Sequence, residues 1–421
     1  MKSILLTRLQ SLRIASILSF LSFCSCFAAG QHTLGDYLQS AVKNSPVFIE
    51  NQNQARSLAL DSMLIRATRK PQVNLTSNDM YAPVINGYGY DEIITNQGNY
   101  NALLGVSYTL LGRNLLANQF SLLDVQKQLL ASDKKIGERD LRQTVTAQYV
   151  TVYGEQQLLE NARQLLGIMA QEDTMLKNIT AKGQYRQTDY LAFYFHLRQQ
   201  QLSISQQAVQ MQNDLFLLNY LCGIVDTSAV TLTDPALDFS QEISYGQSAG
   251  FRHFYLDSLQ IAFSKEQVKY RYHPKVNLLG DAGYNTTFQY HAEKNFGASV
   301  GLSLVIPIYD GRQRDLQLDK FALSENTLLH QAEFFKTQFD MKQMQLKQQI
   351  SETEKLSAEA RAQLQIAITL LKANNKLLES GDIRISDYVI SLTNYISSQA
   401  TVQQLNTGRN LLINQLNYLN Y

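Results

Sequence analysis

Histidine, cysteine and the acidic residues are the side chains of this 421-residue chain that could perform catalysis or hold a metal. The six histidines have no metal-ligand spacing, and no paired-cysteine site, Gly-x-Ser-x-Gly motif or phosphate-binding loop occurs. Acidic residues are paired only where the solvated face of a helix would carry them. The sequence therefore predicts no enzyme, no metal site and no cofactor.

One acidic position belongs to a motif that the chain contains twice. The motif is nine residues long. Gly183 is its first residue and Asp189 its seventh, and Gly381 and Asp387 hold the same positions in the second copy. A second motif, Leu218-Asn219-Tyr220-Leu221, recurs as Leu416-Asn417-Tyr418-Leu419 at the same offset in the sequence. No residue has therefore been inserted or deleted between the first and second motifs of either copy. We expect each glycine to end a helix in the left-handed conformation. Each aspartate is expected to cap or open the helix that returns, because a carboxylate favours a helix N-terminus.

Long helices must lead into and out of these turns. No proline interrupts the chain between Pro83 and Pro235 or after Pro307, and both intervals are rich in helix-forming residues. We predict long helices over about 113–181 and 312–379, with returning helices over about 187–221 and 387–420. A coiled-coil-like stripe of apolar residues supports the first: Leu141, Val145, Tyr149, Val152, Leu159, Ala162, Leu166, Met169, Leu176 and Ile179. At 1.5 Å per residue such a rod is roughly 100 Å long.

Four segments show the period of two that is typical of strands with one apolar face. The clearest runs from Phe296 to Ile306, and the next from Tyr100 to Leu110. We predict strands at about 72–82, 99–111, 275–288 and 295–309. Known membrane barrels need about eight strands or more, so four strands in lipid would have to close with other copies of the chain.

The N-terminus has the features of an export signal. Lys2, Arg8 and Arg13 precede an apolar run, and Ala28-Ala29-Gly30 offers small residues for cleavage before Gln31. Cys24 and Cys26 lack the residues of a lipidation motif, so a lipid anchor is not expected. Cys222 then remains alone and is expected to be a small buried residue. A net charge of +1 without a basic block indicates no nucleic-acid partner.

The chain resembles the TolC-like outer-membrane efflux proteins over essentially its whole mature length. Four features carry this resemblance: His32-Thr33-Leu34, the Pro-x-Val-Asn-Leu motifs at Pro71 and Pro274, the two Gly-x5-Asp turns, and the run Gly301-Leu302-Ser303-Leu304-Val305-Ile306-Pro307-Ile308-Tyr309-Asp310-Gly311-Arg312. The last is the most specific. Two departures are the shortened junction Leu110-Leu111-Gly112-Arg113 and the end of the chain at Tyr421.

The resemblance implies an α+β membrane protein of the Gram-negative outer membrane that is a homotrimer. Its protomers would give four strands each to a twelve-stranded transmembrane β-barrel, and their long antiparallel coiled-coil helices would form a periplasmic α-barrel. It would be the exit duct of a tripartite efflux or type I secretion system, working with a periplasmic adaptor and an inner-membrane pump. We expect a signal peptide at 1–30, a first structural repeat at 31–223, an irregular equatorial segment at 224–247 and a second repeat at 248–421. Each repeat is expected to run helix, two strands, long helix, turn and returning helix.

The resemblance also gives the candidate sites a place. Gly183, Asp189, Gly381, Arg384 and Asp387 would lie at the periplasmic tip, where opening is controlled. Asp387 matches a position that forms an acidic ring, although the family's second acidic position is Ile390 here; the alternative for Asp387 is the helix cap described above. Arg384 would pair with carboxylates or remain a solvated charge.

Aromatic residues gather near the predicted strand ends. Tyr81, Tyr100, Phe288 and Phe296 would form an interfacial belt with outer-membrane lipid, or belong to ordinary loop packing. The competing function is a periplasmic or cell-surface coiled-coil scaffold without a pore. The exported substrate is not predicted by any of these patterns.

Overall fold

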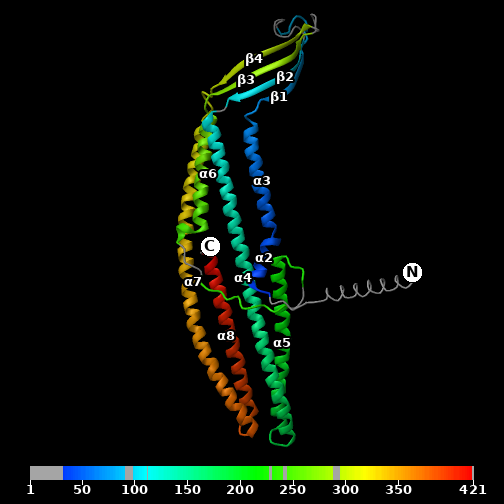
Figure 1. Ribbon diagram of the computed structural model, residues 1–421, viewed down its shortest axis with the longest axis vertical. Coiled ribbons are helices and arrows are strands. Elements are labelled where there is room, and N and C mark those ends of the chain that lie inside the picture. Colours follow the sequence, from blue (N-terminus) through cyan, green and yellow to red (C-terminus); the bar gives the residue numbers. More distant parts are fainter. Residues whose placement is uncertain are drawn as a thin grey trace, which may run out of the picture. The chain divides into compact units, whose positions relative to one another are not determined.

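The computed structural model describes residues 32–90, 98–110, 112–226, 230–239, 244–287 and 294–419 (Figure 1). The predicted leader at 1–30 and the predicted interfacial Phe288 lie outside the described residues. The helices and strands, in chain order, are α2 (Leu34–Asn44), α3 (Pro46–Ala67), β1 (Gln72–Tyr81), β2 (Gly98–Leu110), α4 (Arg113–Ala181), α5 (Gln187–Cys222), the short 3₁₀ helix η1 (Tyr245–Gln247), α6 (Ala249–Arg271), β3 (Lys275–Thr286), β4 (Phe296–Val305), α7 (Gln313–Ser380) and α8 (Ile385–Leu419).

The protein is mostly helical with one four-stranded antiparallel sheet, and this part of the predicted fold class is confirmed. The chain divides into two compact units, which are described separately. The helical unit comprises Met1–Ser45, Asp140–Ser240 and Met344–Leu419, and the sheet unit comprises Pro46–Arg139, Gln241–Gln343 and Asn420–Tyr421. The long helices α4 and α7 each contribute residues to both units.

In the helical unit, α5 lies alongside the C-terminal part of α4, and α8 lies alongside the C-terminal part of α7 (Figure 1). The ends of these four helices share one apolar cluster, the turn cluster: Leu165, Met169, Leu176, Phe193, Leu197, Leu378, Ile385, Tyr388, Val389 and Leu392. A second cluster joins α2 to α4 and α5 around the fully buried Tyr149. The predicted apolar stripe of α4 supplies both clusters, because Val145, Tyr149, Val152, Met169 and Leu176 are all buried.

Polar residues interrupt the stripe of α4 where the backbone of a neighbouring segment needs partners. The side-chain amide of Gln156 donates to the carbonyl of Leu232 at 3.1 Å and accepts from its backbone N–H at 2.9 Å. The hydroxyl of Tyr149 donates to the carbonyl of Thr233 at 2.7 Å. These bonds satisfy backbone groups in a segment without regular structure, so the segment at 230–234 is fixed against α4.

In the sheet unit, the strands follow the order β1-β2-β3-β4, so β1 and β4 are the edges of the sheet. All three pairs are antiparallel, and the register places Leu75 opposite Leu104, Leu104 opposite Ala282, and Ala282 opposite Ala298. Directly opposed residues share a face of a sheet. The period-two pattern of each strand therefore adds up to one apolar face and one polar face across all four strands.

Two sequence expectations about element limits are wrong. The single helix expected before the first strands is two helices, α2 and α3, because Pro46 lacks the backbone N–H that would continue α2 and instead begins α3. The last strand ends at Val305 and does not reach 309. Pro307 has no N–H for a ladder hydrogen bond, so the apolar run outlasts the strand.

Among the residues that the structure describes, no helix has an apolar stretch long enough to cross a membrane.

Candidate functional site

The two glycine turns end their helices in the same way. Gly183 and Gly381 have φ angles of 81° and 83°, which confirms the predicted left-handed conformation. In the first turn the N–H of Gln184 donates to the carbonyl of Ile179 at 3.3 Å, and in the second the N–H of Asp382 donates to the carbonyl of Leu377 at 2.9 Å. This backbone bond satisfies a terminal carbonyl and identifies each turn as a Schellman motif.

The capping role expected for the two aspartates is wrong. The N-cap of α5 is Arg186, which makes no side-chain cap bond, and Asp189 lies inside the first turn of the helix. Asp387 likewise lies in the first turn of α8, which begins at Ile385. After the glycine turn, each helix begins three residues earlier than a cap at the aspartate would require. The carboxylates still lie where the partial positive charge of a helix N-terminus favours them.

The predicted tip residues are surface residues. Gly183, Gly381, Arg384 and Asp387 are exposed and Asp189 is half-buried. Within the described part of the chain, Asp189, Arg384 and Asp387 form no ion pair with one another. The structure therefore places them at the turns without building a charged network from them.

A tyrosine that the sequence analysis did not single out joins the two turns. The hydroxyl of Tyr185 donates to the carbonyl of Ile383 at 2.9 Å and lies 3.3 Å from the carbonyl of Leu378. Tyr185 belongs to the first turn, and Ile383 holds the equivalent position two residues past the second glycine. The difference between tyrosine and isoleucine at this position of two otherwise similar motifs was the sequence signal that could have identified Tyr185.

Acidic side chains are buried between the helices that lead to the turns. Glu172 on α4 is only 8 % exposed. Burial raises the pKa of its carboxyl group; a hydrogen bond from Asn375 acts in the opposite direction, and the nearby charge of Glu379 raises the pKa further. Tyr388 on α8 has its pKa raised by burial and by Glu172. The sequence pattern placed Glu172 among ordinary surface charges, because its burial depends on how α4 meets α7.

The apolar face of the sheet is the second candidate site, and it is exposed. Leu75 on β1 is 75 % exposed, and on β4 Val300 and Leu302 are 85 % and 74 % exposed. The opposite face is polar, as shown by the 2.6 Å hydrogen bond from Ser299 to Asp281 and the side chain of Asn101 on the backbone of Asn78. Contiguous apolar surface of this kind is typical of a binding or membrane interface.

The predicted aromatic residues lie at one end of the strands. Tyr81 ends β1 and Phe296 begins β4, with side chains that are 69 % and 60 % exposed. Phe296 packs edge-on against Tyr284, with ring centroids 5.3 Å apart. Tyr100 on β2 is half-buried. The register pairs Tyr100 with Asp79 of β1 and Phe296 with Tyr284 of β3, so these rings share the apolar face.

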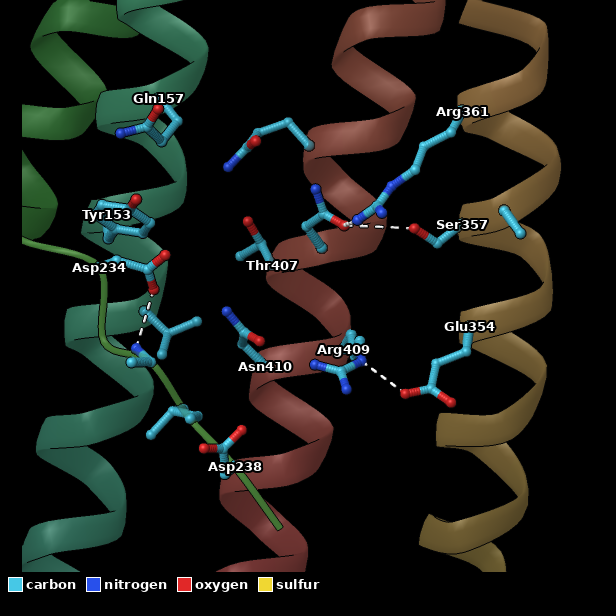
Figure 2. A pocket seen from close by; sticks show the side chains of 16 residues that line it. Tyr153, Gln157, Asp234, Asp238, Glu354, Ser357, Arg361, Thr407, Arg409 and Asn410 are labelled. Atoms are coloured by element: carbon cyan, nitrogen blue, oxygen red, sulfur yellow. Dashed lines mark hydrogen bonds and ion pairs between the residues drawn. The ribbon is translucent and has the colours of Figure 1, made fainter.

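A polar cavity of about 880 Å³ lies in the helical unit (Figure 2). Residues of α4, α7 and α8 line it together with Asp234, Ala236, Leu237 and Asp238. Figure 2 shows Asp234 and Arg361 on opposite sides of it. Arg409 pairs with Glu354 at 2.8 Å, and Arg361 donates to Asn406 at 3.1 Å. Within the described residues no three His, Cys, Asp or Glu side chains gather closely enough to hold a metal ion.

Solved structures with a similar fold are outer-membrane channels. The outer-membrane protein VceC of Vibrio cholerae has 12 % identity and a TM-score of 0.72, over 92 % of this chain and 96 % of its own. A membrane protein of Pseudomonas aeruginosa has 15 % identity and a TM-score of 0.74, over 92 % and 89 %. The channel MtrE of Neisseria gonorrhoeae has 13 % identity and a TM-score of 0.71, over 92 % and 88 %.

No protein-family model matches the chain, and no curated protein matches its sequence. The similarity is therefore one of fold, and it extends over nearly the whole chain. This fold, a mostly helical chain with one four-stranded antiparallel sheet, is that of the TolC-like outer-membrane channels.

Proposed function

We propose that this chain is one protomer of a homotrimeric outer-membrane exit duct. It would conduct substrates passively from an inner-membrane pump and a periplasmic adaptor across the periplasm and the outer membrane of a Gram-negative cell. The chain itself would catalyse no reaction, and the pump would supply the energy. The single observation that carries this proposal is the exposed apolar face of the sheet.

The apolar face fits lipid because it is continuous across all four strands. The cross-strand row Val73, Val106, Gly280 and Val300 contains no polar side chain, and neither does the row Leu75, Leu104, Ala282 and Ala298. The polar face would then line a water-filled lumen. Strands of about ten residues with this alternation are what an outer-membrane barrel uses.

The edges of the sheet support assembly from several copies. β1 and β4 each have one hydrogen-bonded neighbour, and an open edge inside a bilayer would leave backbone groups without partners. Three copies joined edge to edge would give twelve strands, which lies within the range of known barrels. We therefore propose closure by several copies, and among these the trimer is the assembly that the resemblance to TolC-like channels implies.

We also propose that the chain is an internal duplication with the limits 31–223 and 248–421, joined by an equatorial segment at 224–247. The lengths of corresponding helices support this. The long helices α4 and α7 have 69 and 68 residues, and the returning helices α5 and α8 have 36 and 35. Equal helices from both halves are what a tunnel of six similar helix pairs in a trimer would need.

The glycine turns are proposed as the periplasmic tip and gate. Gly183 and Gly381 keep the backbone of each turn exposed, which suits docking by an adaptor, and Asp189, Arg384 and Asp387 supply charge beside them. Asp387 would face its copies in the trimer, where close carboxylates repel one another and attract cations. Tyr81, Tyr100 and Phe296, with Phe288, would form the interfacial aromatic belt.

A pair of substitutions on β4 tests the proposal. Val300→Lys places a charge on the apolar face and is expected to abolish stable insertion, because a lysine facing the bilayer midplane costs about 2–4 kcal/mol in a barrel strand. Ser303→Lys, on the polar face of the same strand, is the matched control and should insert. Membrane fractionation measures insertion, and conductance in planar bilayers measures the channel.

Either of two results would overturn the proposal. A protein that fractionates as soluble without detergent after signal removal would be a scaffold and not a channel. Equal insertion of the two lysine variants would show that the apolar face does not meet lipid.

A further inference from the structure

Two buried oxygen atoms between α4 and α7 lack hydrogen-bond partners. They are Oε2 of Glu172 and the side-chain oxygen Oδ1 of Asn375. When the glutamate is ionised both atoms are acceptors only, so they cannot satisfy each other. A buried acceptor without a donor is unfavourable, and a charged one is more so. The ionised pair is therefore an unfavourable arrangement.

A single proton would satisfy both atoms. A protonated carboxylic acid has one O–H donor and keeps an acceptor oxygen, while a carboxamide has an acceptor oxygen and an NH₂ donor. We propose that Glu172 and Asn375 form a proton-dependent clasp between α4 and α7. In the clasp the Oε2–H of Glu172 donates to Oδ1 of Asn375, and the NH₂ of Asn375 donates to the other carboxyl oxygen.

The surroundings of the clasp favour the proton. Glu379 lies one helical turn beyond Asn375 on α7, and its charge opposes ionisation of Glu172. From α8, Tyr388 interacts with Glu172; it is 1 % exposed and neutral as a phenol. From α5 comes Tyr190, which hydrogen-bonds to the neighbouring Asp173. No cation is among the described groups that shift the pKa of Glu172.

The clasp lies within the turn cluster. On α4, Met169 and Leu176 flank Glu172, and on α7, Leu378 follows Asn375. The clasp therefore ties the pair α4 and α5 to the pair α7 and α8 close to the glycine turns. The regulatory consequence rests on the proposed function: if the turns are the gate, loss of the proton at higher pH makes separation of the two helix pairs easier.

Thermal unfolding of the full-length protein in detergent between pH 5 and pH 9 tests the clasp. A carboxyl whose pKa is raised in the folded state stabilises the fold least at high pH, so the wild type should lose stability as pH rises. We expect a fall in Tm of roughly 2–4 °C attributable to Glu172. Glu172→Gln, which keeps the shape without a titration, should remove this part of the pH dependence.

The matched control is Glu160→Gln, an exposed glutamate on the same helix that accepts a hydrogen bond from Gln164. Its pH profile should follow the wild type. A Glu172→Gln profile that also follows the wild type would overturn the clasp. So would a stabilisation of the wild type by millimolar calcium at pH 9 that Glu172→Gln lacks, since a cation would then occupy the place of the proton.

A local measurement separates the clasp from the gate. Hydrogen exchange of peptides covering the ends of α4 and α7, corrected for intrinsic rates, should show protection that falls with pH in the wild type and not in Glu172→Gln. Unchanged protection in both would overturn the clasp. A protein that shows this pattern but conducts no ions at any pH would retain the clasp and lose the proposed function.

Discussion

At the scale of single residues, the helical unit places carboxyl groups where helices meet. Glu155 on α4 lies beside Asp214 on α5, and Asp214 accepts hydrogen bonds from Gln148 at 3.1 Å and Gln210 at 2.7 Å. Burial and the neighbouring Asp214 raise the pKa of Glu155 to about 7. The carboxyl group of Glu155 therefore holds a proton below neutral pH and loses it above.

Glu155→Gln tests this pair. A folded-state pKa above the unfolded value means that the wild type loses stability as pH rises from about 4.5 to about 7. The variant should be more stable than the wild type by about 1 kcal/mol at pH 8, a figure reduced for solvent screening because Glu155 is half-buried. At pH 4 the two should be equal. Chemical denaturation at both pH values measures the difference, and an effect of the same size at both would contradict it.

At the scale of the helices, the glycine turns fix where α7 ends and α8 begins. A Cβ added at Gly381 would meet no atom within 4 Å, so a substitution there acts only through the backbone, which has a φ of 83°. The same space surrounds Gly408 inside α8, where no left-handed conformation is required. The two glycines thus have equal room for a Cβ and differ in backbone conformation.

Alanine at these two positions should have opposite effects. Gly381→Ala is expected to destabilise the protein by roughly 1–2 kcal/mol, because a left-handed conformation is unfavourable for a residue with a Cβ. Gly408→Ala should stabilise it by roughly 0.5–1 kcal/mol, because alanine favours a helix interior. The free energy of unfolding from chemical denaturation measures both. Destabilisation of similar size at both sites would show that packing, and not conformation, decides.

The helices and strands were predictable where a period defines them. The apolar stripe of α4 and the alternation of β4 follow from spacing alone, since burial of one face imposes it. The capping role of Asp189 was not correctly predicted, because the first helical residue depends on the backbone path out of the Schellman turn. Tyr185 and Glu172 were missed for a different reason: their partners, Ile383 in the second turn and Asn375 on α7, lie about 200 residues away in the sequence.

At the scale of the whole molecule, buried apolar clusters stabilise the helical unit. Cys222 at the end of α5 is completely buried in one of these clusters. The side-chain NH₂ of Asn44 donates to the carbonyl of Cys222 at 2.9 Å, so α2 covers this end of α5. Burial raises the pKa of the Cys222 thiol to about 12. The thiol is thus both inaccessible and protonated at neutral pH.

Cys222 therefore reports opening of the helical unit. Maleimide labelling at pH 7.5 should be on the order of 100-fold slower or more in the native protein than in denaturant, because it requires local unfolding and a thiolate. Asn44→Ala removes the bond to α5 and should speed labelling. Asn51→Ala on α3 should not, because the side chain of Asn51 donates to the carbonyl of Val47 in the same helix. Fast labelling of the wild type would show that α2 does not protect this end of α5.

The separation of apolar and polar side chains onto opposite faces of the sheet also affects the kinetics of assembly. A single newly exported copy would present an apolar face and two open strand edges together, and such edges pair readily with any extended chain. Productive closure would need further copies, so its rate would depend steeply on concentration, while unwanted pairing needs one encounter. In the proposed trimer, the yield of folded protein would depend on which of these two reactions is faster, and the single protomer at low concentration would be the species most prone to unwanted pairing.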